Sequence, residues 1–142
     1  MTRLKNNQIK VLLPEGWDDS TIFSFLGPER AGQRSIITVG VDPSAGSVIA
    51  LEEYAGARAA QVADSMGEPE LLKQESRRLA NGRYVREFAY RSGAGTDRAY
   101  VRLAFMIEQG TGYMFYCRAS RAMRELTALA FRQVIESFTP GA

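Results

Sequence analysis

The dipeptide Asn81–Gly82 constrains the fold of this chain more than any other feature, because it lies between two runs typical of β-strands. Asn-Gly favours a two-residue type I′ turn, whose twist matches that of an antiparallel hairpin. Further turn segments containing glycine occur at 92–97 and 109–112. These turns separate four strand-like runs, at 71–80, 83–91, 98–108 and 113–119. The second half of the chain therefore predicts a four-stranded antiparallel meander.

Three shorter strands are expected in the first half, at 8–13, 21–26 and 34–41. Each run is rich in aliphatic, β-branched or aromatic residues and is followed by Gly, Pro or Asp. The second and third runs have apolar residues on both faces, which is more than a sheet with one solvated face needs. Two explanations stay open. Either helices cover both faces of the sheet, or one face forms an open apolar groove or a subunit interface.

Two helices complete the pattern. Residues 51–66 place apolar side chains at a period of 3.6, and Gly67 follows them as a stop signal. Residues 121–138 have a broad apolar face, with Ser120 as the expected N-cap. The order ββ-β-α-ββββ-α predicts a single α+β domain over 1–142, in which two helices pack on a mainly antiparallel sheet of about six to seven strands.

The chain contains no histidine, and Cys117 is its single cysteine. One thiol cannot form an intramolecular disulfide, and without histidine it lacks the usual base that activates a cysteine nucleophile. Cys117 is therefore expected to be a buried small side chain. Metal binding would fall to carboxylates alone, and no EF-hand-like spacing occurs. We expect a binding protein rather than an enzyme, with no catalytic residues, metal or cofactor.

The charges are unevenly distributed along the chain. Residues 1–70 carry six Lys or Arg against ten Asp or Glu, whereas residues 71–142 carry twelve against six. Fifteen of the eighteen basic residues are arginine, which favours bidentate pairing with carboxylates. We expect such pairs between neighbouring strands, with contact between subunits as the alternative. Nucleic acid is not an expected partner, because no recognisable binding motif accompanies the net charge of +2.

The first sixteen residues lack the apolar core and the cleavage site of a secretory signal. No stretch approaches the roughly 20 consecutive apolar residues of a membrane-spanning helix. We therefore expect a cytoplasmic protein that does not insert into a membrane.

Five segments together resemble the DcrB-like family of small domains of unknown function. They are LPEGWDDSTIFSF, SIITVGVDPSAG, the helix opening LEEY, VRLAFMIEQGTGYMFYCRA and FRQVIESFTP. The resemblance spans roughly 9–140, nearly the whole chain. It implies a fold similar to the Mog1 and PsbP proteins, in which helices lie on both faces of an antiparallel sheet.

One branch of that family consists of cytoplasmic chaperone-adaptors for type VI secretion effectors, and the resemblance implies this role here. Such proteins form homodimers and shield the N-terminal transmembrane helices of an effector on an apolar sheet face. The positions that match the groove of the family are Ile22, Ser24, Ile37 and Val39. Related chaperones place client-binding glutamines where this chain has Arg58 and Leu103.

Two other functions are compatible with the sequence. The first is small-molecule binding or catalysis in a pocket between the sheet and the first helix, formed by Tyr54, Arg58, Tyr84 or Arg102. The second is a regulatory protein-interaction domain similar to the Mog1-type binders.

Overall fold

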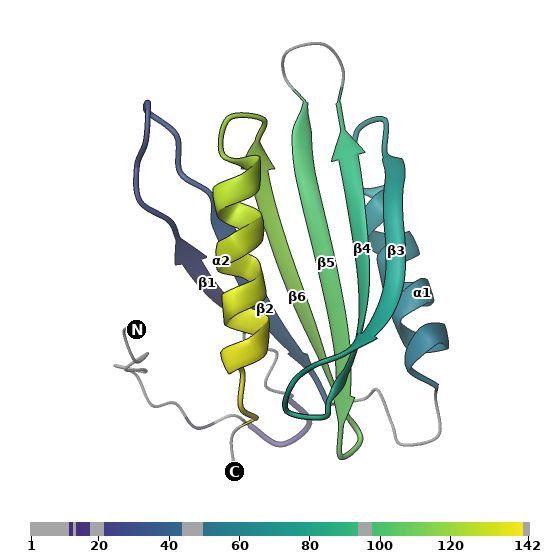
Figure 1. Ribbon diagram of the computed structural model, residues 1–142. Helices are drawn as coiled ribbons and strands as arrows, with labels where there is room; N and C mark the ends of the chain where they lie inside the picture. The colour runs from purple at the N-terminus through teal and green to yellow at the C-terminus, as the bar shows by residue number, and fades with distance from the viewer. Residues whose placement is uncertain (1–11, 13, 18–21, 44–49, 94–97, 141–142) are drawn as a thin grey trace.

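The computed structural model describes residues 12, 14–17, 22–43, 50–93 and 98–140. Six strands form one sheet, with helix α1 on one face and helix α2 on the other (Figure 1). The elements are β1 (Ile22–Leu26), β2 (Ile36–Asp42), α1 (Leu51–Asp64), β3 (Glu70–Arg78), β4 (Tyr84–Ser92), β5 (Ala99–Glu108), β6 (Thr111–Ser120) and α2 (Arg124–Ser137). These elements confirm the predicted α+β class. The strand expected at 8–13 lies outside the described residues except for Leu12, which is not assigned to a strand.

The strands follow the order β1-β2-β6-β5-β4-β3, and every neighbouring pair is antiparallel. Strands β3 to β6 form the predicted meander, and the β1–β2 hairpin joins it through β6. At the β3 edge of the sheet, the pairing register shifts between Leu71 and Lys73, which marks a bulge or irregularity. Of the described strands, β1 and β3 therefore form the two edges.

The turn at Asn81–Gly82 connects β3 and β4, but it is not of type I′. A type I′ turn needs a positive φ at both central residues. Here only Gly82 has one, at 88°, while the Asn81 side chain accepts a hydrogen bond from the Arg83 amide at 3.0 Å. Both central residues of the β5–β6 turn have positive φ values, 51° at Gln109 and 80° at Gly110. The type I′ conformation that was predicted for the β3–β4 turn thus occurs at the β5–β6 turn instead.

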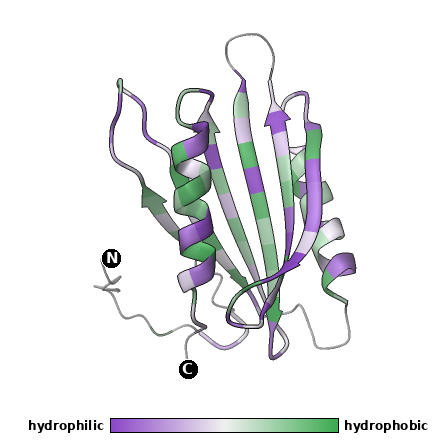
Figure 2. Cartoon of the chain, in the orientation of Figure 1, coloured by the Kyte–Doolittle hydropathy of each residue, from purple (hydrophilic) through white to green (hydrophobic). Residues whose placement is uncertain are grey.

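The two helices bury different sets of side chains. On the α2 side, Phe131 and Ile135 pack with residues of the sheet that include Ile37, Val39 and Phe115. On the α1 side, Ala55 and Ala59 let the helix approach β4 and β5 closely, and the core there contains Tyr54, Phe88, Val101, Leu103 and Phe105. Figure 2 shows the alternation of hydrophobic and hydrophilic residues along the strands between these two layers.

Helix α2 begins later than the sequence predicts. Ser120 is the last residue of β6, pairs with Ala99 of β5, and donates a hydrogen bond from its hydroxyl to Gln33 at 2.6 Å. The N-cap position is Met123, which has no side-chain cap, so the prediction of Ser120 as N-cap is wrong. The guanidinium of Arg124, the first residue of α2, lies 4.2 Å from the centre of the Tyr100 ring. This cation–π contact links the start of the helix to the sheet.

Arginine–carboxylate pairs connect neighbouring strands, as the sequence predicts. Arg77 of β3 makes two hydrogen bonds to Glu87 of β4, at 3.0 and 3.1 Å. Arg91 of β4 donates from Nε to Glu70 of β3 at 3.0 Å. Within the part of the chain that the structure describes, no helix is long and apolar enough to cross a membrane.

Candidate functional site

The pairing of β1 with β2 decides which side chains point to which helix. Phe23 and Phe25 pair with Val39 and Ile37, and all four contribute to the α2-side core. The alternate residues of β1 therefore point to the other face of the sheet, the face that carries α1. They are Ile22, Ser24 and Leu26, and they pair with Gly40, Thr38 and Ile36 of β2.

An apolar strip runs along this face beside α1. We define it by Ile22, Leu26, Ile36, Gly40, Met114 and Tyr116, with Ser24 and Thr38 between them. Helix α1 covers this face only over β4 and β5, toward the β3 edge of the sheet and away from the β1 edge (Figure 1). Ile22 is consequently 63% exposed and Leu26 58% exposed. Ile36, Met114 and Tyr116 are half-buried, and the last two pack against the α1-side core.

The six residues predicted to line a groove do not form one surface. Ile22 and Ser24 lie in the apolar strip, but Ile37 and Val39 point to the other face and are buried at 9% and 7% exposure. Adjacent residues of a strand point to opposite faces, and the pairing with Phe25 and Phe23 places Ile37 and Val39 under α2.

The remaining two predicted residues belong to the α1 side. Leu103 lies in β5 beneath α1 and is fully buried, so it cannot touch a client in this arrangement. Arg58 lies on α1 and forms an ion pair with Asp42, the last residue of β2. The sequence missed Ile36, Met114 and Tyr116 as partners of Ile22. Their alternation along the strands is visible in the sequence, but the pairing of β2 with β6 is not.

Asp42, Tyr54 and Arg58 form a polar cluster at the end of the strip where β2 ends. The Tyr54 hydroxyl donates to the Asp42 carboxylate at 3.4 Å, and the Arg58 guanidinium lies 5.8 Å from the Tyr54 ring centre. Burial, followed by the negative charge of Asp42, raises the pKa of Tyr54 to about 12. Tyr54 therefore stays protonated at neutral pH and acts as a hydrogen-bond donor.

The pocket proposed for a small molecule does not assemble from its predicted residues. Tyr54 and Arg58 lie close together. Tyr84, however, is 58% exposed, and its ring centre lies 5.7 Å from the guanidinium carbon of Arg78. Arg102 alternates with the α1-side residues of β5 and lies on the α2 side, near Cys117 and Thr127. Cys117 is buried as predicted, and this burial raises its thiol pKa to about 12.

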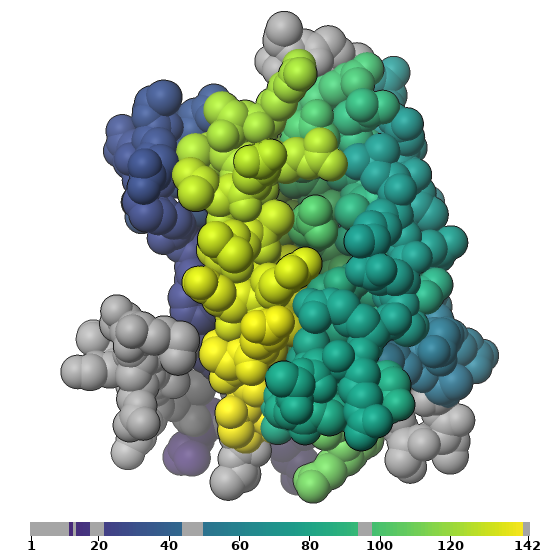
Figure 3. Space-filling view, in the orientation of Figure 1, coloured from purple at the N-terminus to yellow at the C-terminus, as the bar shows by residue number. Residues whose placement is uncertain are grey.

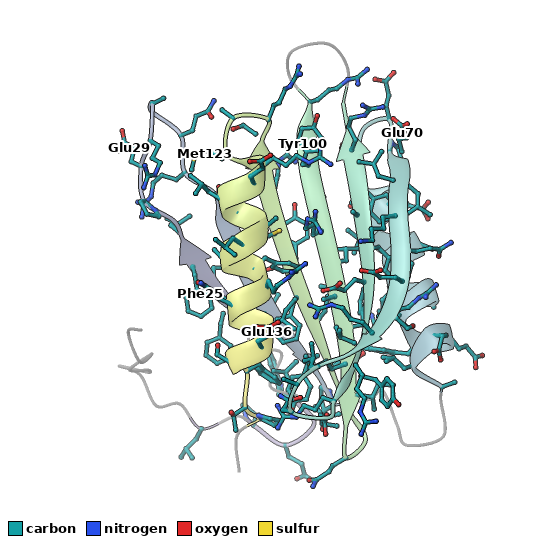
Figure 4. The ribbon with its side chains drawn as sticks, in the orientation of Figure 1. Phe25, Glu29, Glu70, Tyr100, Met123 and Glu136 are labelled. Atoms are coloured by element: carbon teal, nitrogen blue, oxygen red, sulfur yellow. The ribbon has the colours of Figure 1, made fainter. Side chains whose placement is uncertain are left out.

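A second apolar groove lies on the other face, between α2 and the hairpin of β1 and β2. It has a volume of about 270 Å³ and is lined by residues that include Phe25, Ile37, Met123 and Ala130. Leu26 at the end of β1 also borders this groove. The space-filling view faces this side of the molecule, with α2 in yellow beside the blue hairpin (Figure 3), and Figure 4 labels Phe25 and Met123 at the groove.

No model of a known protein family and no curated protein matches this chain. Solved structures do. The chain is similar to the protein of unknown function PA94 from Pseudomonas aeruginosa, with a TM-score of 0.73 and 15% identity over 92% of this chain and 90% of that one. It is also similar to the cyanobacterial PsbP protein CyanoP from Synechocystis sp. PCC 6803, with a TM-score of 0.59 and 14% identity over 84% and 82%.

A third similar structure is LpqN of Mycobacterium tuberculosis, a protein involved in cell envelope biogenesis. Its TM-score is 0.52, at 12% identity over 89% of this chain and 88% of that one. Together these similarities show that the chain has the Mog1/PsbP-like fold. At such identities the similarity extends to the fold alone.

Proposed function

We propose that this protein is a chaperone-adaptor that holds an apolar segment of another polypeptide on the apolar strip. The observation that supports this proposal most is the exposure of Ile22 and Leu26, at 63% and 58%, beside three further apolar side chains of the same sheet face. Contiguous exposed apolar surface of this kind commonly marks an interaction site.

The dimensions of the strip suit a short helical or extended segment. From Ile36 to Gly40 the strip extends over four residue steps of β2, which is roughly 13 Å of strand. About nine residues of an α-helix cover the same distance. Each fully buried aliphatic side chain contributes about 1.5–3 kcal/mol, so a few contacts with Ile22, Leu26 and Ile36 give useful affinity.

The proposed client follows from the resemblance to the DcrB-like chaperones. In this proposal the client is the hydrophobic N-terminal region of a type VI secretion effector, bound in the cytoplasm before export. The chaperone acts as a homodimer, needs no cofactor and catalyses no reaction. The rigid sheet replaces lipid as the apolar environment of the client segment, which otherwise exposes on the order of 20 apolar side chains to water.

Co-expression tests this function directly. The full chain is produced together with an N-terminal fragment of a type VI secretion effector that has hydrophobic N-terminal segments, and the soluble fraction of the fragment is measured. The wild-type chain should keep the fragment soluble, and Ile22→Asp should abolish this effect. Leu129→Asp is the matched control, because Leu129 lies on α2 and is 58% exposed, similar to Ile22. An insoluble fragment with the wild-type chain, or equal loss with both variants, would contradict the proposal.

A further inference from the structure

Three arginine side chains surround a hollow at the end of the sheet where β2 and β5 begin and β6 ends. The hollow has a volume of about 290 Å³, and Arg34, Arg98 and Arg118 line it together with Gln33, Ile36 and Ser120. Arg34, Arg98 and Arg118 are all exposed. We call this feature the arginine hollow.

The arginine hollow carries positive charge that the described residues do not neutralise. Arg58, Arg77, Arg83 and Arg91 each form an ion pair with a carboxylate. By contrast, no carboxylate among the described residues lies within ion-pair distance of Arg34, Arg98 or Arg118. Guanidinium groups gathered around one space repel each other, and an anion placed between them removes that repulsion.

Hydrogen-bond donors in the hollow remain available for such an anion. Arg34 donates from its Nε to the carbonyl of Gly27 at 2.7 Å, and its two terminal nitrogens have no hydrogen-bond partner among the described residues. The Ser120 hydroxyl occupies the carbonyl oxygen of the Gln33 side chain at 2.6 Å, which leaves the Gln33 amide nitrogen as a donor. Guanidinium groups bind carboxylates in a bidentate manner, and these charge-assisted bonds are stronger than neutral ones.

The arginine hollow is continuous with the apolar strip. Ile36 belongs to both, and it pairs directly with Arg118 of β6 and with Leu26 of β1. Arg118 is the next residue after Tyr116 on the same face of β6. The apolar residues of the strip are therefore directly followed by a positively charged side chain. At the other end of β2, the carboxylate of Asp42 is paired with Arg58 and bonded to Tyr54. Among the described residues, the surface is therefore apolar on both sides of Ser24 and Thr38, and its arginines without a carboxylate partner gather at the end near Ile36.

We propose that the arginine hollow binds the acidic residues that flank the apolar segment of the client, and so determines the direction in which that segment lies. This inference rests on the proposed function, because the apolar strip must bind the segment itself. The partner defined by this chemistry is a polypeptide with a run of apolar residues and two or more Asp or Glu residues at one end. Three arginines match several carboxylates better than the single carboxylate of a fatty acid.

Two synthetic peptides test the inference with the full-length chain. Both contain the same twelve-residue Leu/Ala core, followed by Glu-Glu-Glu in one and Gln-Gln-Gln in the other, and affinity is measured by fluorescence anisotropy. The acidic peptide should bind about tenfold more tightly than the neutral one, and added salt should reduce this difference. The double variant Arg98→Gln/Arg118→Gln should remove the preference and leave the affinity for the neutral peptide unchanged. Arg132→Gln on the exposed side of α2 is the matched control and should retain the preference.

The outcomes separate the two proposals. Equal binding of both peptides by the wild-type chain overturns the role of the arginine hollow and leaves the apolar strip as the binding surface. Failure to bind either peptide overturns the proposed function and this inference with it. Displacement of the acidic peptide by oleate at equal or lower concentration, without displacement by a soluble Glu-rich peptide, assigns the hollow to a lipid carboxylate and also overturns the inference. Circular dichroism verifies that the double variant is folded. If it is not folded, the single variant Arg98→Gln is tested in its place.

Discussion

Ile22 of β1 lies directly opposite Gly40 of β2, so the exposed isoleucine has only backbone across from it in the sheet. A Cβ atom placed on Gly40 would lie 3.9 Å from Cγ1 of Ile22, which is an ordinary van der Waals distance. Gly40 is also not one of the glycines with a positive φ. Its backbone conformation therefore does not require glycine, and no described residue other than Ile22 comes within 4 Å of a Cβ at this position, which leaves room for a larger side chain or a client.

Substitutions at Gly40 should separate space filling from folding. Gly40→Ala should retain client binding and raise the free energy of unfolding by about 0.5–1 kcal/mol, because glycine is unfavourable within a strand. Gly40→Phe should occupy the strip beside Ile22 and lower client affinity by about tenfold or more. Urea unfolding and peptide anisotropy measure the two effects. Undiminished binding by Gly40→Phe would show that the client does not lie on the apolar strip.

Ile22 and Ile37 should respond in opposite ways to aspartate, although both were expected to line one groove. Ile22→Asp should change the free energy of unfolding by no more than about 0.5 kcal/mol, because this side chain is 63% exposed. Ile37→Asp should destabilise the protein by several kcal/mol, because it places a carboxylate in the α2-side core. Urea denaturation of both variants measures the difference. Similar stabilities would contradict the assignment of the two side chains to opposite faces.

The buried hydroxyl groups of Ser35 and Thr127 form a hydrogen bond at 2.5 Å, and they link the start of β2 to α2. Thr127→Val should cost about 1–3 kcal/mol, because it leaves the Ser35 hydroxyl buried without its partner. Ser35→Ala/Thr127→Val should cost less than the sum of the single changes, since neither unpaired hydroxyl remains. A double-mutant cycle of unfolding free energies measures the coupling. Strict additivity would mean that the bond does not hold α2 on the sheet.

The thiol of Cys117 should be unreactive in the native protein. Its native pKa of about 12 lies above the ordinary value of 9.0, so the thiolate needed for attack is scarce, and the side chain is only 2% exposed. Labelling with a disulfide reagent at pH 8 should therefore require urea. Rapid labelling of the native chain at this pH would contradict the observed burial.

The same pKa shift predicts how stability depends on pH. Between pH 9 and 12 the unfolded thiol has lost its proton while the native thiol keeps it. The unfolded state then binds fewer protons, so this group lowers stability as the pH rises. Cys117→Ala should reduce the slope of unfolding free energy against pH over this interval. An unchanged slope would exclude Cys117 as its source.

The sequence alone predicts the elements well, because alternation, helical periodicity and turn residues are local signals. Local signals mislead where a longer-range contact prevails. Ser120 has the chemistry of an N-cap, but pairing with Ala99 keeps it in β6. Asn81–Gly82 was predicted to be a type I′ turn, yet the hairpin forms with a longer connection in which the Asn81 side chain accepts from the Arg83 amide.

The candidate site was less predictable than the fold. Residues of β1 and β2 are apolar on both faces, so their composition does not reveal which face a helix covers. That outcome depends on the register Phe25–Ile37 and on the position of α1 over β4 and β5, both of which join distant parts of the chain. The arginine hollow depends on the pairing of β2 and β5 with β6, because Arg34, Arg98 and Arg118 come from three separate segments.

The register shift in β3 between Leu71 and Lys73 has a consequence for aggregation. A foreign strand can extend a sheet only where the outer backbone groups follow a regular spacing, and a bulged edge with a lysine breaks that spacing. Polymerisation through β3 is thereby discouraged, even though Leu71 and Leu72 are 46% and 40% exposed there. The molecule can thus expose apolar side chains on one face of its sheet without nucleating fibrils at the β3 edge.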